Sequence, residues 1–335
     1  MAINHLLGRQ EDIAATHELF KWLDNESRTN IENGQYTLIL DEVLSVLEPL
    51  PVKPGDVKIL LESNCITIDG NNFVHWNPDK HEYDTIFADV RRLAEKKLVI
   101  CVNDTILMWK YPPETFQMFD KVYVLTYLFE ASILKYYFDL HNIEYEKVSL
   151  IHMNNRYDLC KFKKPDTSIF KEKINIYEGA LNSNFYHKNV SLSKYWFEYK
   201  ESNADISILK NNLYNYFRHI VDAKSSEIIW TTFKESASKL KGKGYSSRFI
   251  PFNCRSTNEY RNATTLGYCL NVFLHPGLTG YFSPRGIKID QELYALSEML
   301  QWIWRSGIRD GKSINIYIPS KRMRNLLIDW MSGSF

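Results

Sequence analysis

The segment Tyr36-Thr-Leu-Ile-Leu-Asp41-Glu42-Val43 is an apolar run that ends in two acidic residues. Such a short apolar run predicts a buried strand over residues 36–40. Apolar runs that predict further strands lie at residues 12–16, 98–102, 106–110 and 121–127, and helical spacing of apolar residues occupies 85–97 and 130–141. Strands that alternate with helices in this way predict an α/β fold with mostly parallel sheets and helices on their faces.

The chain has 335 residues, which is more than the roughly 250 to 300 residues at which a single hydrophobic core usually stops growing. We therefore expect two domains, at 1–150 and 151–335, with a small insertion built around a hairpin at about 51–84. In the second half, strands are predicted at 174–177, 228–233, 248–253 and 314–318, and helices at 191–220, 265–273, 291–305 and after residue 318.

The composition is that of an ordinary globular protein. Hydrophobic residues make up 44% of the chain and charged residues 24%, and the net charge of +1 argues against a surface coated in basic charge. The five cysteines form no Cys-x-x-Cys pair, so we expect reduced, mostly buried thiols and a cytoplasmic setting. No secretion signal and no apolar stretch of about 18 residues is present, so we expect no membrane contact.

Two roles are open for Asp41 and Glu42. At the carboxyl end of a strand in a nucleotide hydrolase, the first acid binds magnesium and the second orients or deprotonates the attacking water. Alternatively, Asp41 caps a following helix and Glu42 lies in its first turn. The sequence by itself leaves both interpretations open.

A helix predicted over Leu296-Ser-Glu-Met-Leu-Gln-Trp-Ile-Trp-Arg-Ser-Gly-Ile-Arg309 carries Gln301, Arg305 and Arg309 at spacings of four residues. At about 100° per residue, these three side chains fall within an arc of about 80° and face away from the helix's apolar side. An arginine held across a cleft can stabilise the charge on a transferring phosphoryl group. The alternative is the solvated face of an amphipathic helix.

Polar residues also follow other predicted strands. Thr126 comes at the end of one strand, Thr16 and His17 at the end of another, and Arg255, Thr257 and Asn258 follow the strand predicted at 248–253. Ligands bind at the carboxyl ends of the strands of open α/β sheets, which makes these positions candidate sites.

The order of these segments resembles the superfamily 2 helicases of the DEAD/DEAH-box type, and residues 295–324 look like the C-terminal part of helicase-like proteins of bacteriophages and mobile elements. The resemblance implies two RecA-like lobes and a cytoplasmic, nucleic-acid-dependent NTPase in a bacterial host that uses Mg²⁺ with ATP. It implies that Asp41 and Glu42 form the acidic motif, with Asp41 as the metal ligand. Thr126 corresponds in the same way to the motif that couples the lobes. The final arginine motif corresponds to Gln301, Arg305 and Arg309.

The same resemblance gives a nucleic-acid-binding role to Thr16 and His17 in the first lobe. Arg255, Thr257 and Asn258 fall where the second lobe meets phosphate or nucleotide. The final motif departs from the family, which has glycine before its first arginine and its second arginine three residues further on, whereas Trp304 and Arg309 stand here.

The phosphate loop of the family, Gly-x-x-x-x-Gly-Lys-Ser/Thr, is absent from the chain. Gly311-Lys312-Ser313 lacks the first glycine and follows a helix, whereas a phosphate loop follows a strand and opens a helix. Only about 35 residues precede the acidic strand, so we expect a first lobe that is incomplete at its N-terminus. Its sheet edge should then be covered by the N-terminal residues or by another protein.

Two functions remain open. One is a helicase-like NTPase whose phosphate loop lies on another segment or a partner chain. The other is a helicase-derived module without hydrolase activity that binds DNA, RNA or a protein as a regulator or inhibitor. Nucleic-acid contacts are predicted at Lys321, Arg322 and Arg324, with stacking by Tyr195, Trp196 or Phe197, although a cationic helix start and a packed core explain the same residues.

Overall fold

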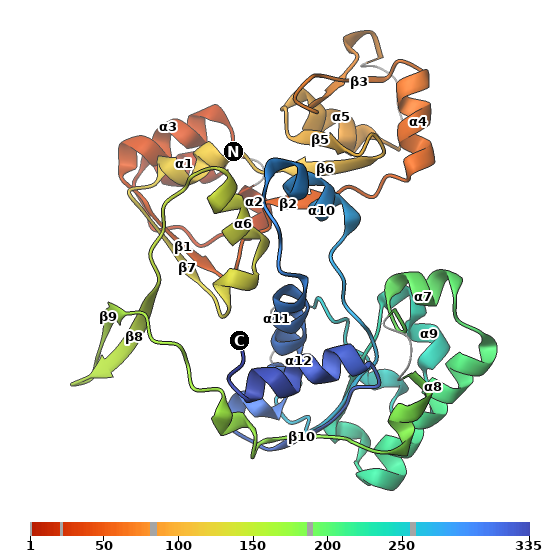
Figure 1. Cartoon of the computed structure of the whole chain (residues 1–335). Coiled ribbons are helices and arrows are strands. Elements are labelled where there is room, and N and C mark those ends of the chain that lie inside the picture. Colours follow the sequence, from red (N-terminus) through yellow and green to blue (C-terminus); the bar gives the residue numbers. More distant parts are fainter. Residues whose placement is uncertain (1, 21–22, 81–85, 186–189, 255–258) are drawn as a thin grey trace. The chain divides into compact units, whose positions relative to one another are not determined.

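The computed structural model describes every residue except 1, 21–22, 81–85, 186–189 and 255–258 (Figure 1). The chain divides into two compact units: unit 1 comprises Met1–Tyr145 and His275–Ile289, and unit 2 comprises Glu146–Leu274 and Asp290–Phe335. The division differs from the expected halves, because a late segment of the chain returns to unit 1.

Unit 1 contains one parallel strand pair, β1 (Thr37–Asp41) and β7 (Lys121–Leu125). Their predicted positions are confirmed within one or two residues. The prediction of a strand at 12–16 is wrong, because these residues form no regular element and are followed by a four-residue helix at His17–Phe20. The helices of this part of unit 1 are α1 (Ala2–Gly8), α2 (His17–Phe20), α3 (Asn25–Gly34) and α6 (Ile133–Leu140), with 3₁₀ turns at Pro113–Met118 and Phe129–Ala131.

Only one face of this strand pair is well covered. Leu38 and Leu40 of β1 are buried, whereas Ile39 on the opposite face is 63% exposed. Its register partner Tyr123 is 37% exposed and Leu125 is 51% exposed. The N-terminal helices contribute Leu7 and Ile31 to a separate small core with Met118.

The rest of unit 1 is antiparallel, which corrects the expectation of mostly parallel sheets. The strands β2 (Leu47–Pro49), β6 (Ile106–Lys110) and β5 (Val99–Val102) form one sheet, and β3 (Ile66–Ile68) and β4 (Val74–Trp76) form the hairpin predicted in the insertion. The helices here are α4 (Pro54–Glu62), α5 (Ala88–Glu95) and α10 (Pro276–Phe282), with 3₁₀ turns at Pro78–Lys80 and Ser283–Arg285. Helix α10 contacts β2, β5 and β6. Only residues 103–105 join β5 to β6, and Asn103 and Asp104 have positive φ, so this short link forces an antiparallel hairpin.

Unit 2 contains a parallel sheet with the strand order β10-β13-β12-β11. The strands are β10 (Ile174–Ile176), β11 (Ile228–Thr231), β12 (Thr265–Tyr268) and β13 (Ile314–Tyr317). Three of them lie where the sequence predicts strands. The helix predicted at 265–273 is wrong: its first four residues form β12, which is buried along its whole length. The strand predicted at 248–253 is reduced to one bridge, between Phe249 and Trp230.

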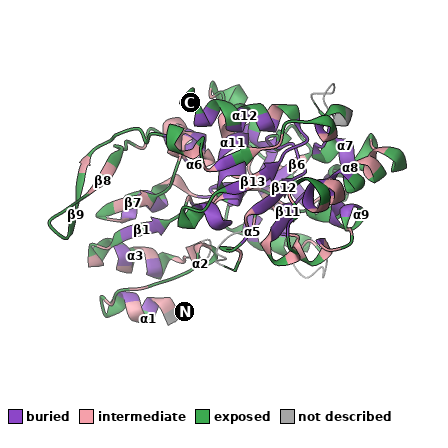
Figure 2. Ribbon diagram, turned by 90° about the horizontal axis from the view of Figure 1, so that it is seen from below, coloured by how far each residue is buried: buried purple, intermediate pink, exposed green. Residues whose placement is uncertain are grey.

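Helices cover both faces of this sheet, as the alternating pattern predicts. On one face, Trp230, Cys269 and Tyr317 share a core with α7 (Lys194–Tyr199), α8 (Asn203–Asn215) and α9 (Ala237–Leu240). On the other face, Tyr268 packs edge-on against Trp302 of α11 (Gln291–Ile303), with 5.5 Å between ring centroids. Helix α12 (Lys321–Met331) contacts α11. The strands β11, β12 and β13 are buried in Figure 2.

The remaining elements of unit 2 are a π-helical turn and short helices around the sheet, together with a hairpin. The hairpin consists of β8 (Val148–Met153) and β9 (Arg156–Lys161), and all of its residues are exposed or only partly buried (Figure 2). The π turn covers Tyr216–Ile220, and the 3₁₀ turns cover Ser168–Phe170, Ala180–Phe185, Ser225–Glu227, Lys234–Ser236, Ser246–Arg248 and Gly307–Asp310.

Candidate functional site

The acidic pair lies at the carboxyl end of β1, next to β7. Asp41 is the register partner of Leu125, and the amide of Glu42 donates a hydrogen bond to the Leu125 carbonyl over 3.1 Å. Both acidic residues are exposed, and Glu42 has a φ of 85°. The next element is β2 and no helix begins here, so the alternative role of Asp41 as a helix cap is wrong.

Thr126 belongs to the same edge, because it directly follows Leu125 at the carboxyl end of β7. It is exposed, and its hydroxyl group donates to the neighbouring Tyr127 carbonyl over 3.3 Å. The parallel pairing therefore brings together three candidates that are some 85 positions apart in the sequence: Asp41, Glu42 and Thr126.

Two carboxylates and a hydroxyl group are oxygen ligands of the type that Mg²⁺ prefers. Among the residues that the structure describes, no group of three or more His, Cys, Asp and Glu side chains is arranged to hold a metal ion. Mg²⁺ commonly keeps several waters and binds through one or two carboxylates together with substrate phosphates. The acidic edge has the ligands for that shared mode of binding.

The arginine motif has a different local structure from the predicted one. Helix α11 ends at Ile303 with Trp304 as its C-cap, and Arg309 lies in the separate 3₁₀ turn Gly307–Asp310. The prediction of one helix through residue 309, with three side chains on a single stripe, is therefore wrong. The physical reason is the Ser306–Gly307 pair: Ser306 caps the new turn, and a Cβ atom at residue 307 would lie 3.2 Å and 3.3 Å from the backbone carbonyl oxygens of Ala263 and Arg261, so this close approach favours glycine.

Gln301, Arg305 and Arg309 all belong to unit 2, and Asp41, Glu42 and Thr126 to unit 1. Gln301 and Arg309 are exposed, and Arg305 is partly buried. The Nε atom of Arg305 is buried and has no hydrogen-bond partner within the described part of the chain.

The basic start of α12 is largely occupied by intramolecular contacts. The Arg322 guanidinium pairs with Glu292 at 2.9 Å and donates to Asn271 and the Val272 carbonyl. Arg324 is only 2% exposed and pairs with Glu178. Of the three predicted phosphate contacts, Lys321 is exposed, Arg322 is partly buried and Arg324 is buried. The prediction that Arg324 contacts nucleic acid is therefore wrong, because its guanidinium is inside unit 2.

The other predicted nucleic-acid contacts have mixed outcomes. Thr16 is exposed and His17 begins α2, so both lie outside any strand. Arg255, Thr257 and Asn258 lie outside the described residues. Of the predicted stacking groups, Trp196 and Phe197 belong to the core of unit 2, whereas Tyr195 is 54% exposed and lies 5.3 Å from the ring of Tyr199.

The β8–β9 hairpin is a surface that the sequence patterns do not single out. On one face it carries Leu150 opposite Leu159 and His152 opposite Tyr157, whose rings are 4.6 Å apart. Tyr157 is 72% exposed, and Lys161 and Lys163 at its base are exposed as well. The run Lys161–Lys164 is visible in the sequence, but the pairing of His152 with Tyr157 on the same face as Lys161 becomes clear only from the register.

Comparison with known proteins gives the chain's family. A relative, the SPbeta prophage-derived uncharacterized protein YonV of Bacillus subtilis strain 168, is 41% identical over 339 residues, covering 98% of this chain and 81% of the relative. The chain belongs to the YonV family. No solved structure matches it.

The family comparison also divides this YonV-family chain into domains. Residues 47–109 match the YonV middle domain, which corresponds to the antiparallel part of unit 1. Residues 168–331 match the YonV C-terminal Rossmann-like domain, which contains the parallel sheet of unit 2. The C-terminal domain is therefore Rossmann-like, and the protein is mixed α/β with parallel sheets. No helix in the described part of the chain combines the length and apolar character needed to span a bilayer.

Proposed function

We propose that this YonV-family chain is a helicase-like scaffold of a phage or mobile element that binds Mg²⁺ and a nucleotide at the acidic edge of β1 and β7. In this proposal both units derive from RecA-like lobes. Asp41 binds the metal, Glu42 orients water, and Thr126 contacts the phosphate side of the site. The prophage origin of the relative is consistent with a phage-encoded protein in a bacterial cytoplasm.

One observation carries the proposal, namely the parallel register of β1 and β7. It puts the backbone of Glu42 in hydrogen-bond contact with Leu125 and hence Thr126 beside the acidic pair. The carboxyl edge of parallel strands is where ligands bind in open α/β sheets. All three side chains are exposed there, so the edge is accessible to a ligand.

The absence of the phosphate loop determines what this scaffold does by itself. The loop's lysine and amide groups give charge-assisted hydrogen bonds of about 1.5 to 3 kcal/mol each, so nucleotide affinity without them is lower by orders of magnitude. We therefore propose weak MgATP binding without turnover by the isolated chain, and hydrolysis only if a partner chain or another segment supplies a loop.

A second candidate function is a module that binds nucleic acid without hydrolysing ATP, with the β8–β9 hairpin as the contact surface. The observation that favours it is the exposed His152–Tyr157 ring pair on a hairpin whose base carries the exposed Lys161 and Lys163. Basic side chains neutralise phosphates, and exposed aromatic rings stack on bases. For unit 1, the corresponding proposal is that a protein partner binds the exposed face that carries Ile39 and Tyr123.

Isothermal titration calorimetry of the full chain with MgATP tests the main proposal. Asp41→Asn removes the charge of the proposed metal ligand. Asp120→Asn is the matched control, because Asp120 is an exposed acid at the opposite, amino end of β7. The proposal requires that Asp41→Asn weakens binding and that Asp120→Asn does not.

A further inference from the structure

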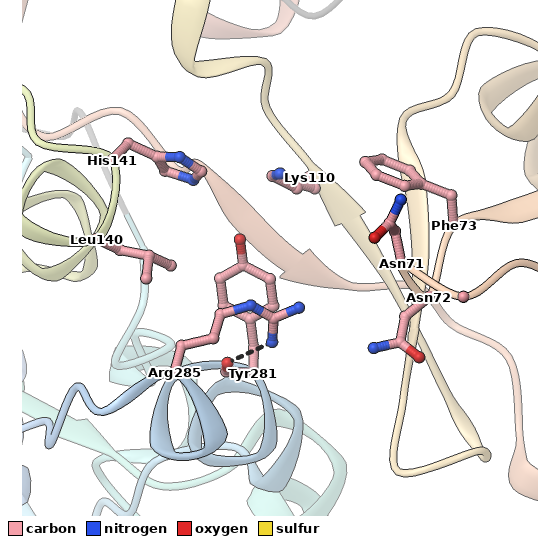
Figure 3. Close-up of a pocket in the computed structure, with 9 residues that line it drawn as sticks. Asn71, Asn72, Phe73, Lys110, Leu140, His141, Tyr281 and Arg285 are labelled. Atoms are coloured by element: carbon pink, nitrogen blue, oxygen red, sulfur yellow. Dashed lines mark hydrogen bonds between the residues drawn. The ribbon is translucent and has the colours of Figure 1, made fainter.

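Unit 1 contains a cavity of about 400 Å³ that is distinct from the acidic edge (Figure 3). Its lining comes from the β3–β4 turn, the end of β6, the end of α6 and the segment 276–285. The lining residues are Gly70, Asn71, Asn72, Phe73, Lys110, Leu140, His141, Tyr281 and Arg285. A volume of this order suits a small molecule, since ligand pockets usually measure about 300 to 1,000 Å³.

Two cations face this cavity, Lys110 and Arg285. The Arg285 guanidinium lies 4.3 Å from the centre of the Tyr281 ring and donates one hydrogen bond, over 2.7 Å, to the Tyr281 carbonyl. The Lys110 ammonium lies 5.4 Å from the centre of the Phe73 ring. Within the described part of the chain, neither cation forms an ion pair with a carboxylate. Burial lowers the pKa of Lys110, and the nearby Glu114 partly opposes this shift.

His141 adds a third nitrogen-bearing group on the opposite wall from Asn71 and Phe73 (Figure 3). Its Nε2 atom is buried and has no hydrogen-bond partner among the described residues. Burial lowers the pKa of His141 to about 4, with the charge of Lys110 acting in the same direction, so the ring is neutral at pH 7. A neutral imidazole can donate from one nitrogen to a bound oxygen atom.

The acidic groups near the cavity do not neutralise this charge. Glu114 is exposed, and it only partly offsets the effects of burial and of Lys110 on His141. Asp69, in the turn that supplies Asn71, accepts hydrogen bonds from the amides of Asn71 and Phe73 and from His75. Its carboxylate is therefore engaged within its own turn, and the cavity keeps an excess of positive charge.

Two cations without carboxylate partners, an unpaired imidazole nitrogen and amide side chains form a set of donors that matches an anion with several oxygen atoms. Phe73, Leu140 and the Tyr281 ring add apolar surface beside that set. We propose that this cavity binds a small phosphomonoester, with its phosphate group between Lys110 and Arg285 and its organic part against Phe73 and Leu140.

Calorimetry on the full chain without Mg²⁺ tests this assignment, with inorganic phosphate, adenosine 5′-monophosphate and adenosine as probes. We expect the monophosphate to bind and adenosine to bind at least tenfold more weakly. If inorganic phosphate binds as tightly as the monophosphate, the ligand is free phosphate, and the assignment of a phosphate site between Lys110 and Arg285 stands. Equal binding of adenosine and its monophosphate, or binding by neither phosphate probe at millimolar concentration, overturns the proposal.

Arg285→Gln tests the residues. It removes one charged donor, and a loss of roughly tenfold to 100-fold in affinity is expected from the usual strength of a charge-assisted hydrogen bond. Arg92→Gln is the control, because Arg92 is an exposed arginine of unit 1 outside the cavity. Thermal unfolding of each variant reports whether it is folded. A folded Arg285→Gln variant with unchanged affinity contradicts the proposal.

Asp41→Asn separates this site from the nucleotide site proposed above. Asp41 does not line the cavity, so its substitution should leave binding of the monophosphate unchanged even where it abolishes binding of MgATP. Failure of one site therefore does not imply failure of the other. Coincident loss of binding at both sites, in a folded variant, contradicts their separation.

Discussion

Arg324 of α12 pairs with Glu178, the second residue after β10, through a 2.8 Å contact between Nε and a carboxylate oxygen. The arginine is 2% exposed, and its Nη1 also donates to the Ile318 carbonyl at the end of β13 over 2.8 Å. One buried guanidinium thus joins the carboxyl ends of two neighbouring strands, β10 and β13.

Arg324→Met should therefore destabilise unit 2. The variant keeps an apolar side chain but leaves the buried Ile318 carbonyl without this donor, and an unsatisfied buried group costs about 1 to 3 kcal/mol. Urea denaturation measures the change in the free energy of unfolding. Lys321→Met, at the exposed start of the same helix, should change it by less than about 0.5 kcal/mol. Equal effects of the two substitutions contradict a structural role for Arg324.

Gly267→Ala should destabilise the sheet of unit 2 through overpacking. A Cβ atom at residue 267 would lie 2.8 Å from Leu213 Cδ2 and 3.0 Å from Phe217 Cζ, so these packed side chains have to shift. Added methyl groups in packed cores cost about 1 to 3 kcal/mol. Gly55→Ala, in the first turn of α4, meets no atom within 4 Å and should be neutral or slightly stabilising. Thermal unfolding of both variants checks the difference.

This glycine also explains one error of the sequence-based prediction. Residues 265–273 are a short, mostly apolar run, and such a run fits a buried helix and a buried strand equally well. The choice depends on Gly267, whose missing side chain lets α8 approach the sheet, and that contact joins positions about 50 residues apart. Runs with a clear boundary, such as Ile106–Lys110 and Ile314–Tyr317, are located correctly.

Local sequence patterns predict neither the direction in which strands pair nor the structure of the arginine motif. The run at 99–102 is recognisable as a strand, but its antiparallel partner follows from the positive φ of Asn103 and Asp104. The acidic edge is predictable because Asp41, Glu42 and Thr126 each end a strand, and parallel pairing brings such ends together. The cavity is not predictable from the sequence, because its lining residues Lys110, His141 and Arg285 come from three distant segments and form no sequence motif.

The β8–β9 hairpin gives a test of the nucleic-acid-binding function. The double substitution Lys161→Glu and Lys163→Glu should weaken binding of single-stranded DNA and reduce its salt dependence, by about 0.7 in the logarithmic slope for each phosphate that the hairpin no longer neutralises. Fluorescence anisotropy at several salt concentrations measures both quantities. Charge reversal at Lys171, exposed outside the hairpin, is the control. Binding that does not respond to salt speaks against the hairpin as the contact surface.

His141 makes the stability of the ligand-free chain depend on pH. Its pKa falls from the usual value of 6.5 to about 4 on folding because of burial, so the unfolded chain binds more protons between these values. The contribution of His141 to the free energy of unfolding is therefore complete above about pH 6.5 and declines as the pH falls toward 4. His141→Gln should flatten that part of the curve of unfolding free energy against pH. Parallel curves for the two proteins contradict the buried, neutral state of His141.

The most direct test of the proposed function is calorimetric titration of MgATP into the full chain, its Asp41→Asn variant and its Asp120→Asn control. We predict weak binding that Asp41→Asn reduces at least tenfold and that Asp120→Asn leaves unchanged. Absence of MgATP binding, or binding that is equally strong in all three folded proteins, contradicts a Mg²⁺–nucleotide site at the edge formed by Asp41, Glu42 and Thr126.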